Sequence, residues 1–296
     1  MAPRLIVLVV LASCGRVDFD PLGDASLAGD GNAGDGAAAC TAFGPWGAPK
    51  RIAELATTAS EYGGQMLGDG LTLYFDRHTT VPDELFVAQR PDRASPFGPA
   101  QALPALGTAS STGSATLSAD GLELYFETGS PVCIHRATRA TTASAWGAPV
   151  PVAALCGSPT EGAFLTSDGL TLYYNTATPP TDYEGTIMIT TRASTTVGFG
   201  AGSPAGIVLT ATNGYPALSS NELTIYFESG APTDLWQATR PDRGSSWGAP
   251  SEIAGVNTAS IEQDVSISPD GTELFFASDR MTSGDLDLYV ATRACL

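Results

Sequence analysis

Four acidic residues stand where a carbohydrate-cleaving enzyme could place its reacting groups. Each falls on or beside a segment that we expect to form the innermost strand of a repeated unit: Glu61, Glu161, Glu262 and Asp264. Glycoside hydrolysis needs two carboxyl groups at a defined separation, one of them with a raised pKa. The alternative role for these residues is a hydrated channel mouth or cation binding there, so we treat them as candidate channel-mouth acids.

Other residue types offer little reactive chemistry. His78 and His135 lie in different repeats and have no partner at zinc-ligand spacing, so we predict no metal site. The sequence has no nucleophile-elbow motif in Ser–His–Asp order and no Asp-box of the sialidase type. We therefore expect no cofactor and no catalytic residue. A carbohydrate-active hydrolase or lyase that uses the inner-strand carboxylates remains the alternative.

A set of arginines occupies one register of the repeat, one in each unit: Arg90, Arg139, Arg192, Arg240 and Arg293. A ring of guanidinium groups could bind an anion. However, each arginine precedes an aromatic residue, and the net charge of −17 supplies many carboxylates. We expect each arginine to stack on the aromatic residue that follows it or to pair with a carboxylate.

The elements that position these residues come from five copies of one unit. The copies begin at aromatic residues separated by 51, 49, 53 and 48 residues: Trp46, Phe97, Trp146, Phe199 and Trp247. A period of about 40–50 residues is typical of a four-stranded propeller blade. No stretch shows a sustained helical period. The sequence predicts an all-β fold, a five-bladed β-propeller of four-stranded blades, over residues 45–296.

Each unit contains a strand of small residues, a turn and an alternating apolar run such as Leu122 to Phe126. Asp-Gly between two such runs is a strong hairpin signal, because both central residues of the turn need positive φ. The fourth unit has Asn221-Glu222 instead, so we expect its turn to differ. Small residues such as Ser114 and Ala115 suit the crowded innermost strand.

The first 44 residues have a different composition. Arg4 precedes eight apolar residues, too few to span a bilayer, which needs about 20. Leu11-Ala12-Ser13-Cys14 resembles the lipobox of bacterial lipoproteins, which implies cleavage before Cys14, lipidation of its sulfur and, with Gly15 next, the outer membrane. An ordinary signal peptide is the alternative. We expect residues 1–13 to be the signal and 14–44 to be a disordered tether, whose aspartates do not match a calcium-binding EF-hand loop.

The repeats resemble the WD40-like propeller repeats of TolB-type bacterial envelope proteins. The fifth unit carries the family core intact as Ser268-Pro269-Asp270-Gly271 and ends in Asp287-Leu288-Tyr289. The resemblance covers residues 45–296. It implies that each unit begins on the outermost strand of the preceding blade. The segment after Trp46 would then complete the last blade, and the ring would be closed by N- and C-terminal strands.

Four cysteines remain besides Cys14: Cys40, Cys133, Cys156 and Cys295. An even number outside the cytosol favours pairing. In the repeat register, Cys40 and Cys295 fall at almost the same point of the ring closure, and Cys133 and Cys156 fall on adjacent strands. We expect two disulfides, Cys40–Cys295 and Cys133–Cys156, with free buried cysteines as the alternative.

Charge narrows the choice of partners. Lys50 is the only lysine, so the protein lacks the clustered cations that nucleic acid needs, and we expect membrane contact only through the lipid anchor. We predict a monomeric outer-membrane lipoprotein, facing the periplasm or the surface, that binds or scaffolds an envelope protein or glycan. The first candidate contact loops are Thr176 to Glu184 and Ser278 to Asp285. A purely structural protein is a further alternative.

Overall fold

The computed structural model describes Cys40, residues 42–78, 83–103, Leu106, and residues 112–178, 181–207 and 213–296. These residues belong to one compact unit, Ala37–Leu296. The expected signal peptide, lipidation site and tether aspartates lie outside the described residues. Within the part of the chain that is described, no helix is long and apolar enough to cross a membrane.

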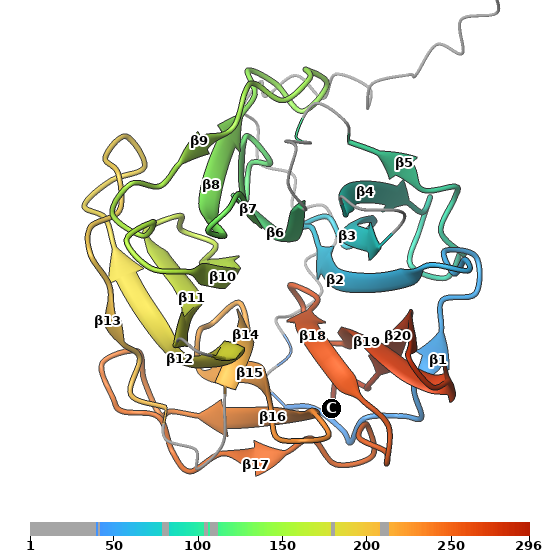
Figure 1. The fold of residues 1–296 in the computed structure, drawn as a ribbon. Coiled ribbons are helices and arrows are strands. Elements are labelled where there is room, and N and C mark those ends of the chain that lie inside the picture. Colours follow the sequence, from blue (N-terminus) through green and yellow to red (C-terminus); the bar gives the residue numbers. More distant parts are fainter. Residues whose placement is uncertain are drawn as a thin grey trace, which may run out of the picture. The chain divides into compact units, whose positions relative to one another are not determined.

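The fold is a five-bladed β-propeller of four-stranded antiparallel sheets, as predicted (Figure 1). In every blade the first-named strand is the innermost, and the others follow outward from the axis. Blade 1 is β2 (Ser60–Met66), β3 (Thr72–His78), β4 (Glu84–Gln89) and β5 (Gln101–Ala102). Blade 2 is β6 (Thr112–Leu117), β7 (Glu123–Thr128), β8 (Cys133–Thr138) and β9 (Val150–Pro151).

The remaining blades follow the same order. Blade 3 is β10 (Thr160–Leu165), β11 (Thr171–Thr178), β12 (Thr181–Thr191) and β13 (Ser203–Pro204). Blade 4 is β14 (Asn213–Leu218), β15 (Thr224–Ser229), β16 (Asp234–Thr239) and β17 (Ser251–Glu252). Blade 5 is β18 (Glu262–Ile267), β19 (Glu273–Thr282), β20 (Asp285–Thr292) and β1 (Lys50–Arg51).

The two ends of the chain close the ring in the last blade, as expected from the repeat order. Strand β1 pairs with β20, with Lys50 opposite Val290 and Arg51 opposite Tyr289. The Cys40–Cys295 disulfide links positions 255 residues apart beside this closure, and the second disulfide joins Cys133 to Cys156. Both predicted pairings are therefore confirmed. Closure leaves no open seam between the first and last blades.

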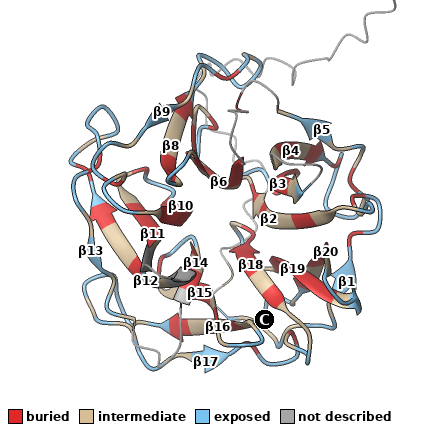
Figure 2. Cartoon of the chain, in the orientation of Figure 1, coloured by how far each residue is buried: buried red, intermediate tan, exposed pale blue. Residues whose placement is uncertain are grey.

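The core lies between the blades and is dominated by the apolar run at the centre of each second strand. These runs are Leu73–Phe75, Leu124–Phe126, Leu172–Tyr174, Ile225–Phe227 and Leu274–Phe276, and none of their residues is more than 4 % exposed. Both faces of the sheets are covered because neighbouring blades sandwich them. Buried positions accordingly recur along the inner strands and in the interior of every blade (Figure 2).

The register arginines have the structural role expected of them. Their guanidinium groups lie 4.2–5.0 Å from the rings of the aromatic residues that open the next unit, in the pairs Arg90–Phe97, Arg139–Trp146, Arg192–Phe199, Arg240–Trp247 and Arg293–Trp46. Each also donates a hydrogen bond to the carbonyl of the second turn residue. In Arg139, for example, Nε lies 2.7 Å from the Gly121 oxygen. The arginines thus tie each turn to the loop that leads into the next unit.

The turn of the fourth blade does not differ from the others, so that expectation was wrong. Glu222 has φ 59°, close to the 67° to 75° of Gly70, Gly121, Gly169 and Gly271. Asn221 Oδ1 accepts the Leu223 N–H at 3.0 Å, as Asp120 accepts that of Leu122. An asparagine side chain offers the same acceptor as aspartate, and a non-glycine residue in the left-handed region costs about 1–2 kcal/mol.

The expected contact loops are largely strand. Ala177 pairs with Gly185 between β11 and β12, and Thr282 pairs with Asp285 between β19 and β20. Both segments therefore lie largely within long hairpins of their blades.

Candidate binding site in the central channel

The five innermost strands carry a β-bulge at the same position. Within each bulge one residue has positive φ, between 47° and 64°: Gly63, Ser114, Gly162, Tyr215 and Asp264. Bulges bend a strand and turn its N–H groups out of the ladder. At Gly162 the crowding is severe, because a Cβ would approach the Cα of Tyr215 to 2.9 Å.

The N–H groups of these bulge residues are bound by side chains of neighbouring blades. Second-strand side chains accept four of them: Asp76 from Ser114 (3.3 Å), Glu127 from Gly162 (3.0 Å), Asn175 from Tyr215 (3.3 Å) and Glu228 from Asp264 (2.7 Å). Blade 5 has Ala277 at the corresponding register, and the carboxylate of Asp264 itself accepts from Gly63. We call Asp76, Glu127, Asn175, Glu228 and Asp264 the acceptor ring.

Four members of the acceptor ring are ionisable and have perturbed pKa values. Burial raises the pKa of Asp76, Glu127 and Glu228 well above the usual carboxyl range, and it raises that of Asp264 to about 6. Neighbouring carboxylates add to the effect, and no arginine or lysine is among the main influences on these four groups. Like charges held together out of water favour the protonated form.

Two of the four predicted acids lie inside their own blades. Glu61 and Glu262 are fully buried. Each forms an ion pair with an arginine of its own blade, Glu61 with Arg77 at 2.8 Å and Glu262 with Arg280 at 2.9 Å. Neither is among the residues that line the two described cavities on the axis. The second strand runs antiparallel beside each inner strand, which brings its arginine opposite or close to the glutamate.

The other two acids come together beside the axis. Asp264 belongs to the acceptor ring, and the charge of Glu161 raises the Asp264 pKa further. Glu161 is 7 % exposed and accepts a hydrogen bond from the Tyr215 hydroxyl at 3.4 Å. Burial also raises the pKa of that tyrosine well above its usual value. The structure therefore places these two acids in one cluster.

The sequence analysis missed Asp76, Glu127 and Glu228, which complete this cluster. A signal was present, since each follows the aromatic end of its second-strand apolar run in one register, as Asn175 also does. Among the described residues no group of three or more His, Cys, Asp or Glu side chains is placed to hold a metal ion.

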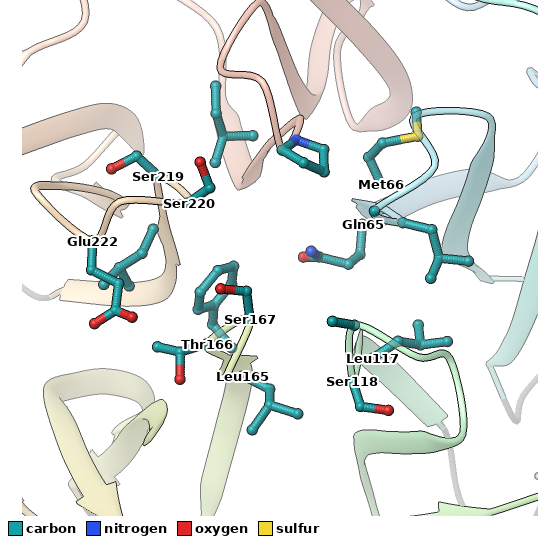
Figure 3. Close-up of a pocket in the computed structure, with 17 residues that line it drawn as sticks. Gln65, Met66, Leu117, Ser118, Leu165, Thr166, Ser167, Ser219, Ser220 and Glu222 are labelled. Carbon is teal, nitrogen blue, oxygen red and sulfur yellow. The ribbon is translucent and has the colours of Figure 1, made fainter. Parts of the chain in front are cut away.

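The channel has a narrow section and a wide one. The narrow section, about 30 Å³, lies at the bulges beside Asp264 and Tyr215 and has room for about one water molecule. The wide section, about 120 Å³, opens at the end that carries the Asp-Gly turns (Figure 3). We call it the turn-face pocket. Its lining includes Met66, Leu117, Phe164, Leu218 and Ile267, and all five blades contribute to it.

Most hydroxyl groups at the pocket are already used within the turns. Ser118 donates to Asp120 at 2.6 Å, and Thr166 and Ser219 make the equivalent bonds in their own blades. Gln65 differs, because its side chain points toward the middle of the pocket (Figure 3) and lines both channel sections. Its side-chain amide makes no hydrogen bond to any of the residues that the structure describes. The pocket therefore combines an apolar lining with one free amide.

Comparison with known proteins identifies other proteins that have the same fold. No family model and no curated protein matches the sequence. The structure is similar to the catalytic domain of a GH62 α-L-arabinofuranosidase from Coprinopsis cinerea, with TM-score 0.59 and 13 % identity over 85 % of this chain and 98 % of that one. An α-L-arabinofuranosidase from Podospora anserina, solved with cellotriose, gives TM-score 0.54 and 10 % identity over 80 % and 91 %.

A putative TolB from Agrobacterium tumefaciens gives TM-score 0.50 and 15 % identity over 82 % of each chain. At these identities the similarity shows the propeller fold alone. Propellers carry many unrelated activities. TolB is thus among the structural neighbours of this chain, together with glycan hydrolases.

Proposed function

We propose that the protein is a lipid-anchored binding module of the bacterial envelope, whose turn-face pocket receives part of a protein or glycan partner. The pocket is the observation that carries the proposal. It lies on the axis, is built by all five blades, and combines an apolar lining with the free amide of Gln65. An apolar concavity with few convergent polar groups is typical of a ligand site.

Glycan hydrolysis is the second candidate, because the acceptor ring holds carboxyl groups of raised pKa, as a general acid requires. Two observations weigh against it. The ring acids Asp76, Glu127 and Glu228 each accept a blade-to-blade N–H. The channel beside the ring has room for about one water molecule and not for a sugar ring. We therefore assign the acceptor ring a structural role.

The envelope location rests on two features of the chain. The lipobox-like segment ending at Cys14 supports a signal peptide over residues 1–13 and a tether over 14–44. The Cys40–Cys295 and Cys133–Cys156 disulfides favour an oxidising compartment. We place the protein at the outer membrane, facing the periplasm or the surface, as a monomer that touches the membrane only through its anchor.

A pull-down with the purified full-length protein tests the proposal against envelope extract and cell-wall glycan in parallel. The decisive variant is Ala119→Trp, which fills the rim of the turn-face pocket. The matched control is Val197→Trp, at a half-exposed residue outside the pocket lining. We expect a retained partner to be lost with Ala119→Trp and kept with Val197→Trp. Retention of the same partner by both variants would refute a role for the pocket.

A further inference from the structure

Charge narrows what can occupy the turn-face pocket. Among the described residues that line it, Glu222 is the one ionisable group, and it is 7 % exposed. Its carboxylate already faces Arg243 at 3.3 Å and Arg240 at 3.8 Å. A charged group entering the pocket would therefore be desolvated without a free counter-charge, which is strongly unfavourable. The complementary occupant is electrically neutral.

The volume of the turn-face pocket limits the size of the group that can occupy it. The pocket has a volume of about 120 Å³. An engineered apolar cavity of about 150 Å³ in another protein holds benzene. The pocket thus matches a single group of the size of a leucine, methionine or phenylalanine side chain. Buried Met66, Leu218 and Ile267 would pack against such a group, since each is at most 4 % exposed.

The free amide of Gln65 indicates which class of molecule the turn-face pocket binds. The Gln65 amide offers donors and an acceptor, the same pair that a main-chain amide needs. A pyranose would need many more partners, and the hydroxyls of Ser118, Thr166 and Ser219 are committed to their turns. Ser167 and Ser220 are the two remaining hydroxyl residues of the lining, which are too few to match the hydroxyl groups of a pyranose. The lining therefore suits a peptide better than a glycan.

On the basis of the proposed function as a binding module, we infer that the turn-face pocket takes one uncharged apolar side chain of a polypeptide partner, with the adjoining main-chain amide paired to Gln65. The partner is then a protein with an exposed Leu, Met or Phe in an extended or looped segment. Its affinity comes from burying that side chain and from the amide pair.

Ligand-observed NMR titrations of the full-length protein test this with four probes: N-acetyl-leucinamide, N-acetyl-phenylalaninamide, N-acetyl-lysinamide and N-acetylglucosamine. For neutral probes of this size we expect a Kd of the order of 1 mM. The lysine and sugar probes should bind at least roughly tenfold more weakly, which is the scale of a small loss of complementary contact. Gln65→Leu should weaken the leucine probe by about tenfold, and Ala119→Trp should abolish its binding, whereas Val197→Trp should leave it unchanged. Thermal unfolding of each variant checks that the fold is kept.

The other outcomes overturn the inference in distinguishable ways. If N-acetylglucosamine binds as tightly as the leucine probe and its binding is lost in the Ala119→Trp variant, the occupant is a glycan and the binding-module function survives. Tighter binding of the lysine probe would refute the neutral occupant. If no probe binds up to about 20 mM, twenty times the expected Kd, the peptide inference fails. The pull-down with Ala119→Trp then decides the fate of the proposed function separately.

Discussion

Replacing Asp264 by asparagine should stabilise the propeller at neutral pH. Burial raises the Asp264 pKa to about 6, against an ordinary value of 3.8. The folded state holds this proton more tightly than the unfolded state. The contribution of the protonated Asp264 carboxyl to the folding stability is therefore fully present below the unfolded pKa of 3.8, and it is lost as the pH rises through about 6. The difference between the two pKa values corresponds to roughly 3 kcal/mol above that range.

Asparagine removes the charge and keeps the geometry. Its side-chain oxygen can still accept the Gly63 N–H, and asparagine tolerates the positive φ of 55° found at this position. At pH 7.5 we expect Asp264→Asn to raise the free energy of unfolding by about 3 kcal/mol, or the melting temperature by roughly 6–12 °C. Near pH 4 the gain should fall well below about 1 kcal/mol, because the wild-type carboxyl is then protonated in the folded state and still about half protonated in the unfolded state.

Urea unfolding at pH 4, 5, 6 and 7.5 with intact disulfides measures the effect. The exposed residue Glu252 provides the control, and Glu252→Gln should change stability little at any of these pH values. The argument would be refuted by an Asp264→Asn protein that is less stable than wild type at pH 7.5. A gain of the same size at pH 4 and pH 7.5 would also refute it, because the gain would then not come from removing a charge.

Three further outcomes can be checked. Glu61→Ala should lower the free energy of unfolding by about 3–5 kcal/mol in urea titrations, because it leaves Arg77 in a buried site without its carboxylate; a change below about 1 kcal/mol, the scale of a surface ion pair, would contradict the burial argument. Removing the Cys40–Cys295 disulfide by a double serine substitution should lower stability by up to about 5 kcal/mol, since the bond closes a loop of 255 residues, and calorimetry of both forms measures this. Aryl arabinofuranosides should show no turnover above the uncatalysed rate, and turnover that disappears in Glu228→Gln would instead establish the hydrolase alternative.

The acceptor ring explains how a cluster of acids can belong to a structural element. Four of its members are carboxyl groups that cap bulge N–H groups between blades, and their raised pKa values follow from that buried position. The neutral Asn175 performs the same task in blade 3. A raised carboxyl pKa beside a channel is therefore insufficient to mark catalysis, because an amide can replace the carboxyl in the same ring.

The sequence alone determined the architecture of this protein. The aromatic entries at Trp46 and its four equivalents set the number of blades, and the repeat register predicted both disulfides and the closure of blade 5 by β1. The stacking of Arg139 on Trp146 was also predictable. These features follow from local patterns repeated at a fixed period, which a single chain displays directly.

Only the tertiary structure decided which polar residues meet. Glu61 and Asp264 both fall on inner strands, yet one is bound by an arginine of its own blade and the other caps a neighbouring blade. The turn at Glu222 has the same shape as the others against the local expectation, because Asn221 supplies the acceptor that aspartate supplies elsewhere and Arg240 binds the Glu222 carbonyl as in the other blades. The ring and the turn-face pocket join residues from all five blades, and their contacts depend on bulges and on the packing of blade against blade. The closed ring as a whole sets the distances between these residues, so they cannot be read from the sequence of a single repeat.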